Sequence, residues 1–123
     1  MRAWMPAGLA LLTVAFGAVR EPLLQRAPAA DTARPNPLSS DDRNRMAGAK
    51  LYDHVCAACH GRERQGIGHA PPLARPEIWN ASPGAIFWVL RNGSLVHGMP
   101  SFASLPELER WQIIVFLQTR GNK

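Results

Sequence analysis

The chain has 123 residues, enough for one domain of ordinary small size. Its formal net charge is +5, but the basic residues are scattered, with no basic run and no regular interleaving of arginine with aromatic residues. This distribution argues against nucleic-acid binding.

The amino-terminal residues have the pattern of an export signal. Arg2 precedes an uncharged, mostly apolar run from Ala3 to Val19. At ~1.5 Å per residue this run would form a helix of roughly 25 Å, against a hydrocarbon core of about 30 Å. The small residues Ala15 and Gly17 offer only a weak cleavage pattern. We therefore predict a signal peptide or membrane anchor over residues 1–19, with the rest of the chain on the periplasmic side of the cytoplasmic membrane.

Residues 20–39 contain four prolines and few large apolar side chains. Such a composition cannot bury much surface and predicts an extended, proline-rich tether. The folded domain is then expected over residues 40–123, where ten basic and seven acidic residues leave a net charge of +3. A domain this small is short of apolar core.

Helix signals occur first at Ser40, which can cap a helix and is followed by two aspartates in the first turn. The apolar residues that follow predict a helix up to about Val55. A second helix is predicted after Ser82, with Pro83 at its first position and Gly93 at its exit.

A third helix is predicted after the capping-box pattern of Ser104 and Glu107, with Gly121 beyond its end. A short helical turn is possible over residues 75–80. Glycine and proline make residues 61–73 and 93–101 irregular loops, and no stretch alternates as a strand would. The expected fold is all-α, with three main helices and short turns.

The two cysteines belong to one motif, in which Cys56 and Cys59 are followed at once by His60. Thiols three positions apart can form thioethers with the two vinyl groups on one edge of a porphyrin, and the adjacent imidazole can bind the iron. This motif is typical of covalent attachment of one haem c. The haem would also supply the apolar body that a small domain lacks.

Other interpretations of the cysteines are weaker. A thioredoxin-like pair would need a βαβ context and would leave His60 without a role. A zinc site would need further ligands, commonly a second cysteine pair. A disulfide between Cys56 and Cys59 would close a tight, strained loop.

The second axial ligand of the iron has five candidates: Met46, His54, His69, His97 and Met99. Met46 and His54 precede the attachment motif, and His69 follows it too closely to pass easily round the porphyrin. Met99 lies thirty-nine residues beyond the attachment histidine, in a loop between glycine and proline. We predict Met99 as the ligand, with His97 as its rival. Methionine–histidine ligation raises the reduction potential.

Residues 40–123 resemble the small bacterial class I monohaem cytochromes c. The resemblance rests on the attachment motif, on Gly48 and Tyr52 before it, on the Ala70–Leu73 loop, on Met99 with its following proline, and on the closing helix around Phe116. It implies a cytochrome c-like fold wrapped round one haem, in which the first and last helices cross. Ala70 departs from the glycine that the family often has there.

The resemblance also implies a role for Pro71. The carbonyl of Pro71 would accept a hydrogen bond from His60 and so orient it. From the residues themselves we expect Trp79 and Trp88 to line the haem pocket, where either indole N–H could donate to a propionate, although plain core packing suits Trp88 better. Three arginines near the pocket would either steer an acidic partner or be simply solvated: Arg62, Arg64 and Arg75.

These features favour single-electron transfer, by a carrier that is tethered to the membrane or free in the periplasm of a respiratory or photosynthetic chain. The alternative is a fixed haem subunit of a larger membrane oxidoreductase complex. A gas sensor or peroxidase is disfavoured, because Met99 would fill the open iron position and because the chain has a single attachment motif. Donor and acceptor proteins are not identified by the sequence.

Overall fold

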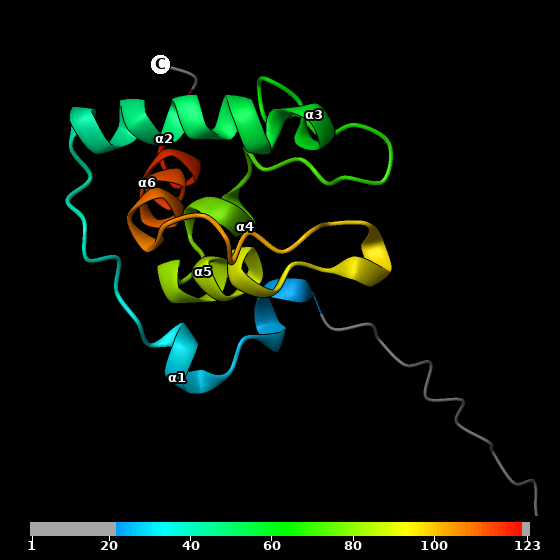
Figure 1. Ribbon diagram of the computed structural model, residues 1–123, viewed down its shortest axis with the longest axis horizontal. Coiled ribbons are helices and arrows are strands. Elements are labelled where there is room, and N and C mark those ends of the chain that lie inside the picture. The colour runs from blue at the N-terminus through cyan, green and yellow to red at the C-terminus, as the bar shows by residue number, and fades with distance from the viewer. Residues whose placement is uncertain (1–21, 122–123) are drawn as a thin grey trace, which may run out of the picture.

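The computed structural model describes residues 22–121 (Figure 1). The predicted signal or anchor, residues 1–19, lies outside the described residues. Within residues 22–121 all regular structure is helical, and β pairing is limited to two isolated bridges. This confirms the all-α prediction. The helices are η1 (Leu23–Arg26), α1 (Ala29–Thr32), α2 (Asp42–Val55), α3 (Ala57–His60), α4 (Pro76–Trp79), α5 (Pro83–Asn92), η2 (Leu95–His97) and α6 (Glu107–Leu117).

None of the helices between residues 22 and 121 combines the length and the apolar character needed to cross a membrane.

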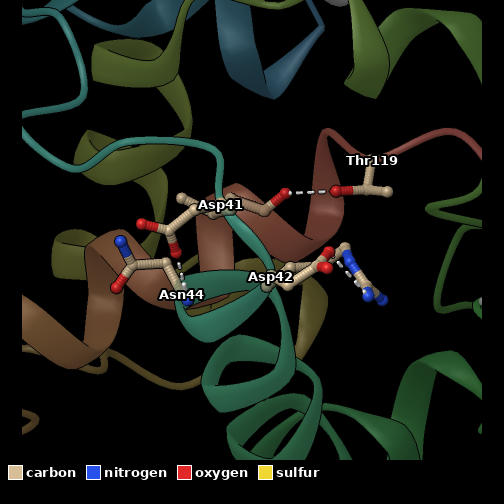
Figure 2. A network of polar contacts seen from close by, with 6 residues as sticks. Asp41, Asp42, Asn44 and Thr119 are labelled. Atoms are coloured by element: carbon tan, nitrogen blue, oxygen red, sulfur yellow. Dashed lines mark hydrogen bonds and ion pairs between the residues drawn. The ribbon is translucent and has the colours of Figure 1, made fainter.

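We predicted Ser40 as the cap of helix α2, but the structure has Asp41 in that position. The Asp41 carboxylate accepts a hydrogen bond from the backbone N–H of Asn44 at 2.8 Å, as Figure 2 shows. It accepts a second from the Ser39 hydroxyl at 2.7 Å. These two bonds hold the pKa of Asp41 below its usual value. Because a carboxylate cap also matches the positive end of the helix, the aspartate displaces the neighbouring serine from this position.

The ends of the other long helices follow the sequence more closely. Helix α5 begins at Pro83 and ends before Gly93, whose φ of +65° suits glycine. The Ser82 hydroxyl does not cap this helix but donates to the carbonyl of Thr32. The capping box predicted for α6 is absent, since Pro106 occupies the cap position and no side chain caps the helix.

Helices α2 and α6 cross closely at Gly48, on one side of the molecule in Figure 1. A Cβ at this position would lie 1.9 Å from the carbonyl oxygen of Gln112, so only glycine permits this approach. One turn further along, the rings of Tyr52 and Phe116 pack at 5.3 Å between centroids. The Tyr52 hydroxyl donates to the carbonyl of Gly61 at 2.7 Å. The helix crossing is thereby joined to the loop that follows the cysteine motif.

Residues 22–39, which we call the strap, do not form the extended tether that the sequence predicts. They fold into η1 and α1 and pack against α5 (Figure 1). Leu24 and Leu38 both contact the buried core. A few apolar side chains and several backbone contacts therefore hold this proline-rich segment to the helical body, which composition alone did not reveal.

Candidate functional site

A cavity of about 970 Å³ lies among α3, the loops that follow it and the loop after α5. This volume is near the upper end of the ~300–1,000 Å³ range of cofactor sites. Most of its wall is apolar, including Val55, Ile78, Ile86, Leu90, Phe102 and Leu117. The side chains at its wall that could attach a porphyrin or bind its iron are Cys56, Cys59, His60, His69, His97 and Met99. The fold thus gathers both cysteines and four of the predicted iron-binding candidates around one space.

The two cysteines lie at the junction of α2 and α3. Cys56 ends α2 and is buried, whereas Cys59, on α3, is exposed. Both thiols are free, and burial, with the nearby Cys59, raises the pKa of Cys56 to about 12. A catalytic redox pair needs the opposite shift, toward a thiolate at neutral pH. This environment disfavours a thioredoxin-like role.

No group of three or more histidine, cysteine or acidic residues within residues 22–121 could hold a metal ion by itself.

His60 is oriented by a single backbone contact. Its Nδ1 lies 2.9 Å from the carbonyl oxygen of Pro71. A carbonyl can only accept, so Nδ1 donates, and the lone pair of the neutral ring is on Nε2. Since His60 lines the cavity, Nε2 is the nitrogen available to a metal there. The contact is the one that the family resemblance implies for Pro71.

The five candidates for the second axial position separate by location. Met46 and His54 are on α2 and do not line the cavity, whereas His69, His97 and Met99 do. Both of these histidines are exposed, and His97 Nδ1 is 2.7 Å from the Ser94 hydroxyl. Met99 is half-buried and packs against the core.

The loop around Met99 is well fixed. Paired backbone hydrogen bonds of 2.9 and 3.0 Å join Ser94 to Met99 and close the turn that contains η2. Gly98 allows this turn with a φ of +78°. In Figure 1 this yellow loop and the green segment after α3 lie on the same side of the molecule. The methionine is thus held at the cavity wall by backbone geometry.

Neither of the two tryptophans expected to line the haem pocket, Trp79 and Trp88, lies at the cavity wall. Trp79 is at the end of α4, and its indole N–H is buried without a hydrogen-bond partner among the described residues. Trp88 is half-buried on α5. By contrast, Arg75 lines the cavity, and its Nε is also a buried donor without a hydrogen-bond partner there. The carboxylate of Glu77 lies 3.8 Å from that Nε, too far for a hydrogen bond.

Arg64 has neither of the surface roles considered from the sequence. Only 1% of it is exposed, and its guanidinium donates to the carbonyls of Phe116, Leu117, Thr119 and Gly121 at the end of α6. It also stacks 4.6 Å from the centroid of the Phe116 ring. Arg62, by contrast, is exposed and pairs with Asp53 at 3.5 Å. Arg64 therefore joins the loop after the cysteine motif to the closing helix.

These donors fit a c-type haem. Two thiols can hold the porphyrin edge, an oriented imidazole and a thioether can bind iron, and the unpaired Nε of Arg75 suits an acidic substituent. Residues 43–117, more than half of the chain, match the family model described as cytochrome c oxidase, cbb3-type, subunit III. The chain belongs to this family of c-type cytochromes. The predicted membership of the class I monohaem cytochromes, with one covalently bound haem c, is thereby confirmed.

Two relatives place this cytochrome among redox proteins. It is 39% identical over 95 residues to the quinohemoprotein alcohol dehydrogenase ADH-IIG of Pseudomonas putida, a match that covers 76% of this chain and 12% of that protein. The chain thus spans only a small part of that relative. Cytochrome cL of Methylophaga aminisulfidivorans is similar in structure, with a TM-score of 0.54 and 25% identity over 63% of this chain and 53% of that one. Electron transfer by a c-type haem is the function common to this family.

The sequence did not reveal that the strap is part of the cavity wall. Pro22, Leu23, Leu24 and Arg26 all line the cavity. The adjacent leucines were the available signal, as an apolar pair within an otherwise proline-rich and polar segment.

Proposed function

We propose that this cytochrome is a single-electron carrier in which Cys56 and Cys59 attach one haem and His60 and Met99 bind its iron. The observation that supports this most directly is that all four side chains line one apolar cavity. When bound, the haem supplies an iron that cycles between the ferrous and ferric states. With both axial positions filled, no open position is left for a substrate, which favours a carrier over an enzyme.

The protein's own residues prepare this site before any redox partner arrives. The carbonyl of Pro71 fixes the His60 ring and its tautomer, and such a contact also raises the basicity of the metal-binding nitrogen. Cys56 and Cys59 would hold the haem through thioether bonds to its two vinyl groups, and burial of Cys56 raises the pKa of its thiol. Apolar walls exclude water, which limits the reorganisation that accompanies a change of charge.

The surface around the cavity mouth suits transient contact with a redox partner. Leu95 and Val96, next to the Met99 loop, are 81% and 83% exposed, and Ile67 at the cavity is 54% exposed. Partly apolar patches of this kind mark interaction sites. The partners we propose are a dehydrogenase as donor and a membrane oxidase as acceptor.

A second candidate is a fixed haem subunit of a larger oxidoreductase. It is favoured by the match to part of a quinohemoprotein dehydrogenase, in which the similar sequence is a small portion of a longer chain. Extraction of native membranes without detergent separates the two. A carrier is released or purifies alone, whereas a subunit stays with its partners.

We further propose that residues 1–19 direct export and either are cleaved or remain as an anchor at the periplasmic face of the membrane. The mass of the mature protein from its native membrane distinguishes these outcomes.

Haem attachment is tested by replacing both thiols, Cys56→Ser with Cys59→Ser. We expect acid-acetone extraction to leave the haem with the wild-type polypeptide and to remove all of it from the double variant. Haem retained by the double variant, or lost from the wild type, contradicts the assignment.

A further inference from the structure

The strap reaches the haem cavity from outside the part of the chain that matches the family. That match begins at residue 43, whereas the strap ends at residue 39. Within the strap, Pro22 and three residues of η1, Leu23, Leu24 and Arg26, lie at the cavity wall, and Leu24 also contacts the buried core. In Figure 1, η1, in blue, lies beside α5. The strap therefore supplies one arginine and several apolar side chains to a site whose attachment residues lie far along the sequence.

The strap is held in place at a second position, away from the cavity. The Arg34 guanidinium lies 4.7 Å from the ring centroid of Phe87 and 5.4 Å from that of Trp111, and these two rings stack at 4.1 Å. Asn36 donates to the carbonyl of Trp111 at 3.2 Å. None of these four residues lines the cavity.

Gly84 makes the docking of the strap sterically demanding. A Cβ on this residue would lie 1.9 Å from the carbonyl oxygen of Asp31 and 2.8 Å from that of Arg34. Both oxygens belong to the backbone, so a larger residue cannot be accommodated by rotating a side chain. The fit between α5 and the strap thus depends on one glycine, and this glycine is not part of the cavity.

We propose that the strap is an integral wall of the haem site and that its docking at Gly84 and Arg34 raises the reduction potential. The inference rests on the proposed haem function. Water stabilises the more positively charged ferric centre, so an apolar wall that excludes water favours the ferrous form. The positive charge of Arg26 acts in the same direction, because it repels the extra charge of ferric iron. Both effects are lost when the strap leaves the cavity.

Two variants of the full-length, haem-loaded protein release the strap without altering any cavity residue. Gly84→Ala displaces it sterically, and Arg34→Ala removes its contact with Phe87 and Trp111. Arg91→Ala is the matched control, because Arg91 is an exposed arginine on the same helix, α5, and makes no ion pair among the described residues.

Two measurements follow the strap and the haem separately. Hydrogen exchange of residues 22–39 reports docking, and spectroelectrochemical titration reports the midpoint potential. We expect both strap variants to exchange at least tenfold faster over these residues. We also expect the reduction equilibrium to shift about tenfold toward the oxidised form, which is about 59 mV for one electron. Arg91→Ala is expected to change neither quantity.

The proposal is overturned if both variants keep the strap protected from hydrogen exchange. It is also overturned if the strap is released while the reduction equilibrium stays within twofold of that of the wild-type protein. Failure of the proposed haem function would be distinguishable, because the wild-type protein would then contain no covalent haem to titrate.

Discussion

Arg64 offers the sharpest test of how the attachment loop is held to the rest of the fold. We consider Arg64→Met, which keeps a long, flexible side chain but removes the guanidinium. The variant would remove the Arg64 donor from the carbonyls at the end of α6, and burial limits the access of water to them. It would also remove the cation–π contact with Phe116.

The expected loss follows from the contact geometry. One guanidinium nitrogen is shared among three carbonyls at 3.2–3.4 Å, and the other donates to Gly121 at 2.7 Å. We therefore count about two effective hydrogen bonds, each worth about 1.5–3 kcal/mol when charged. Partial hydration of the freed carbonyls offsets some of this sum. The free energy of unfolding should fall by about 3 kcal/mol, and Tm should fall by about 12 °C or more.

Guanidinium chloride unfolding of the haem-loaded protein, followed by far-UV circular dichroism, measures this change. Arg62→Met is the matched control, because the Arg62 side chain is 85% exposed and forms only a surface ion pair. Its effect should stay within about 0.5 kcal/mol. If Arg64→Met also falls within about 1 kcal/mol of the wild type, then the buried network does not stabilise the fold as we argue.

Three further predictions follow from other sites. Tyr52 is the only tyrosine, and burial, with a smaller effect of Cys56, raises its pKa to about 12 against an ordinary 10.0. The stability contributed by the protonated phenol is present below pH ~10 and is lost as the pH rises through about 12. Tyr52→Phe should therefore abolish this loss of stability and the tyrosinate absorbance that accompanies it. A Tyr52 that titrates at the ordinary pKa of a free tyrosine would contradict this prediction. Gly48→Ala should lower the free energy of unfolding, measured with chemical denaturant, by about 2 kcal/mol or more, because the added Cβ meets backbone atoms of Gln112. An unchanged unfolding midpoint would disprove the tight crossing of α2 and α6. Met99→Ala should abolish the thioether–iron charge-transfer band of the oxidised protein, whereas His97→Ala should preserve it; the reverse result would assign His97 as the ligand.

Some features of the fold could be predicted because they depend on neighbouring residues. The limits of α5 follow from Pro83 and Gly93, which restrict the backbone wherever they occur. The caps of α2 and α6 were predicted wrongly for a related reason. Several adjacent residues could serve as caps, and the path of the preceding chain selected Asp41 and Pro106 instead of Ser40 and Ser104.

The sequence by itself determined the chemistry of the site, because the spacing of Cys56, Cys59 and His60 is fixed within about one turn of chain. It also indicated a methionine in a constrained loop. Only the tertiary structure decided which groups surround these residues. Arg64 is buried, and the strap docks against α5 and lines the cavity, because contacts between residues far apart in sequence offset the cost of ordering them. Such contacts leave little local pattern, so composition predicted solvated arginines and an extended tether.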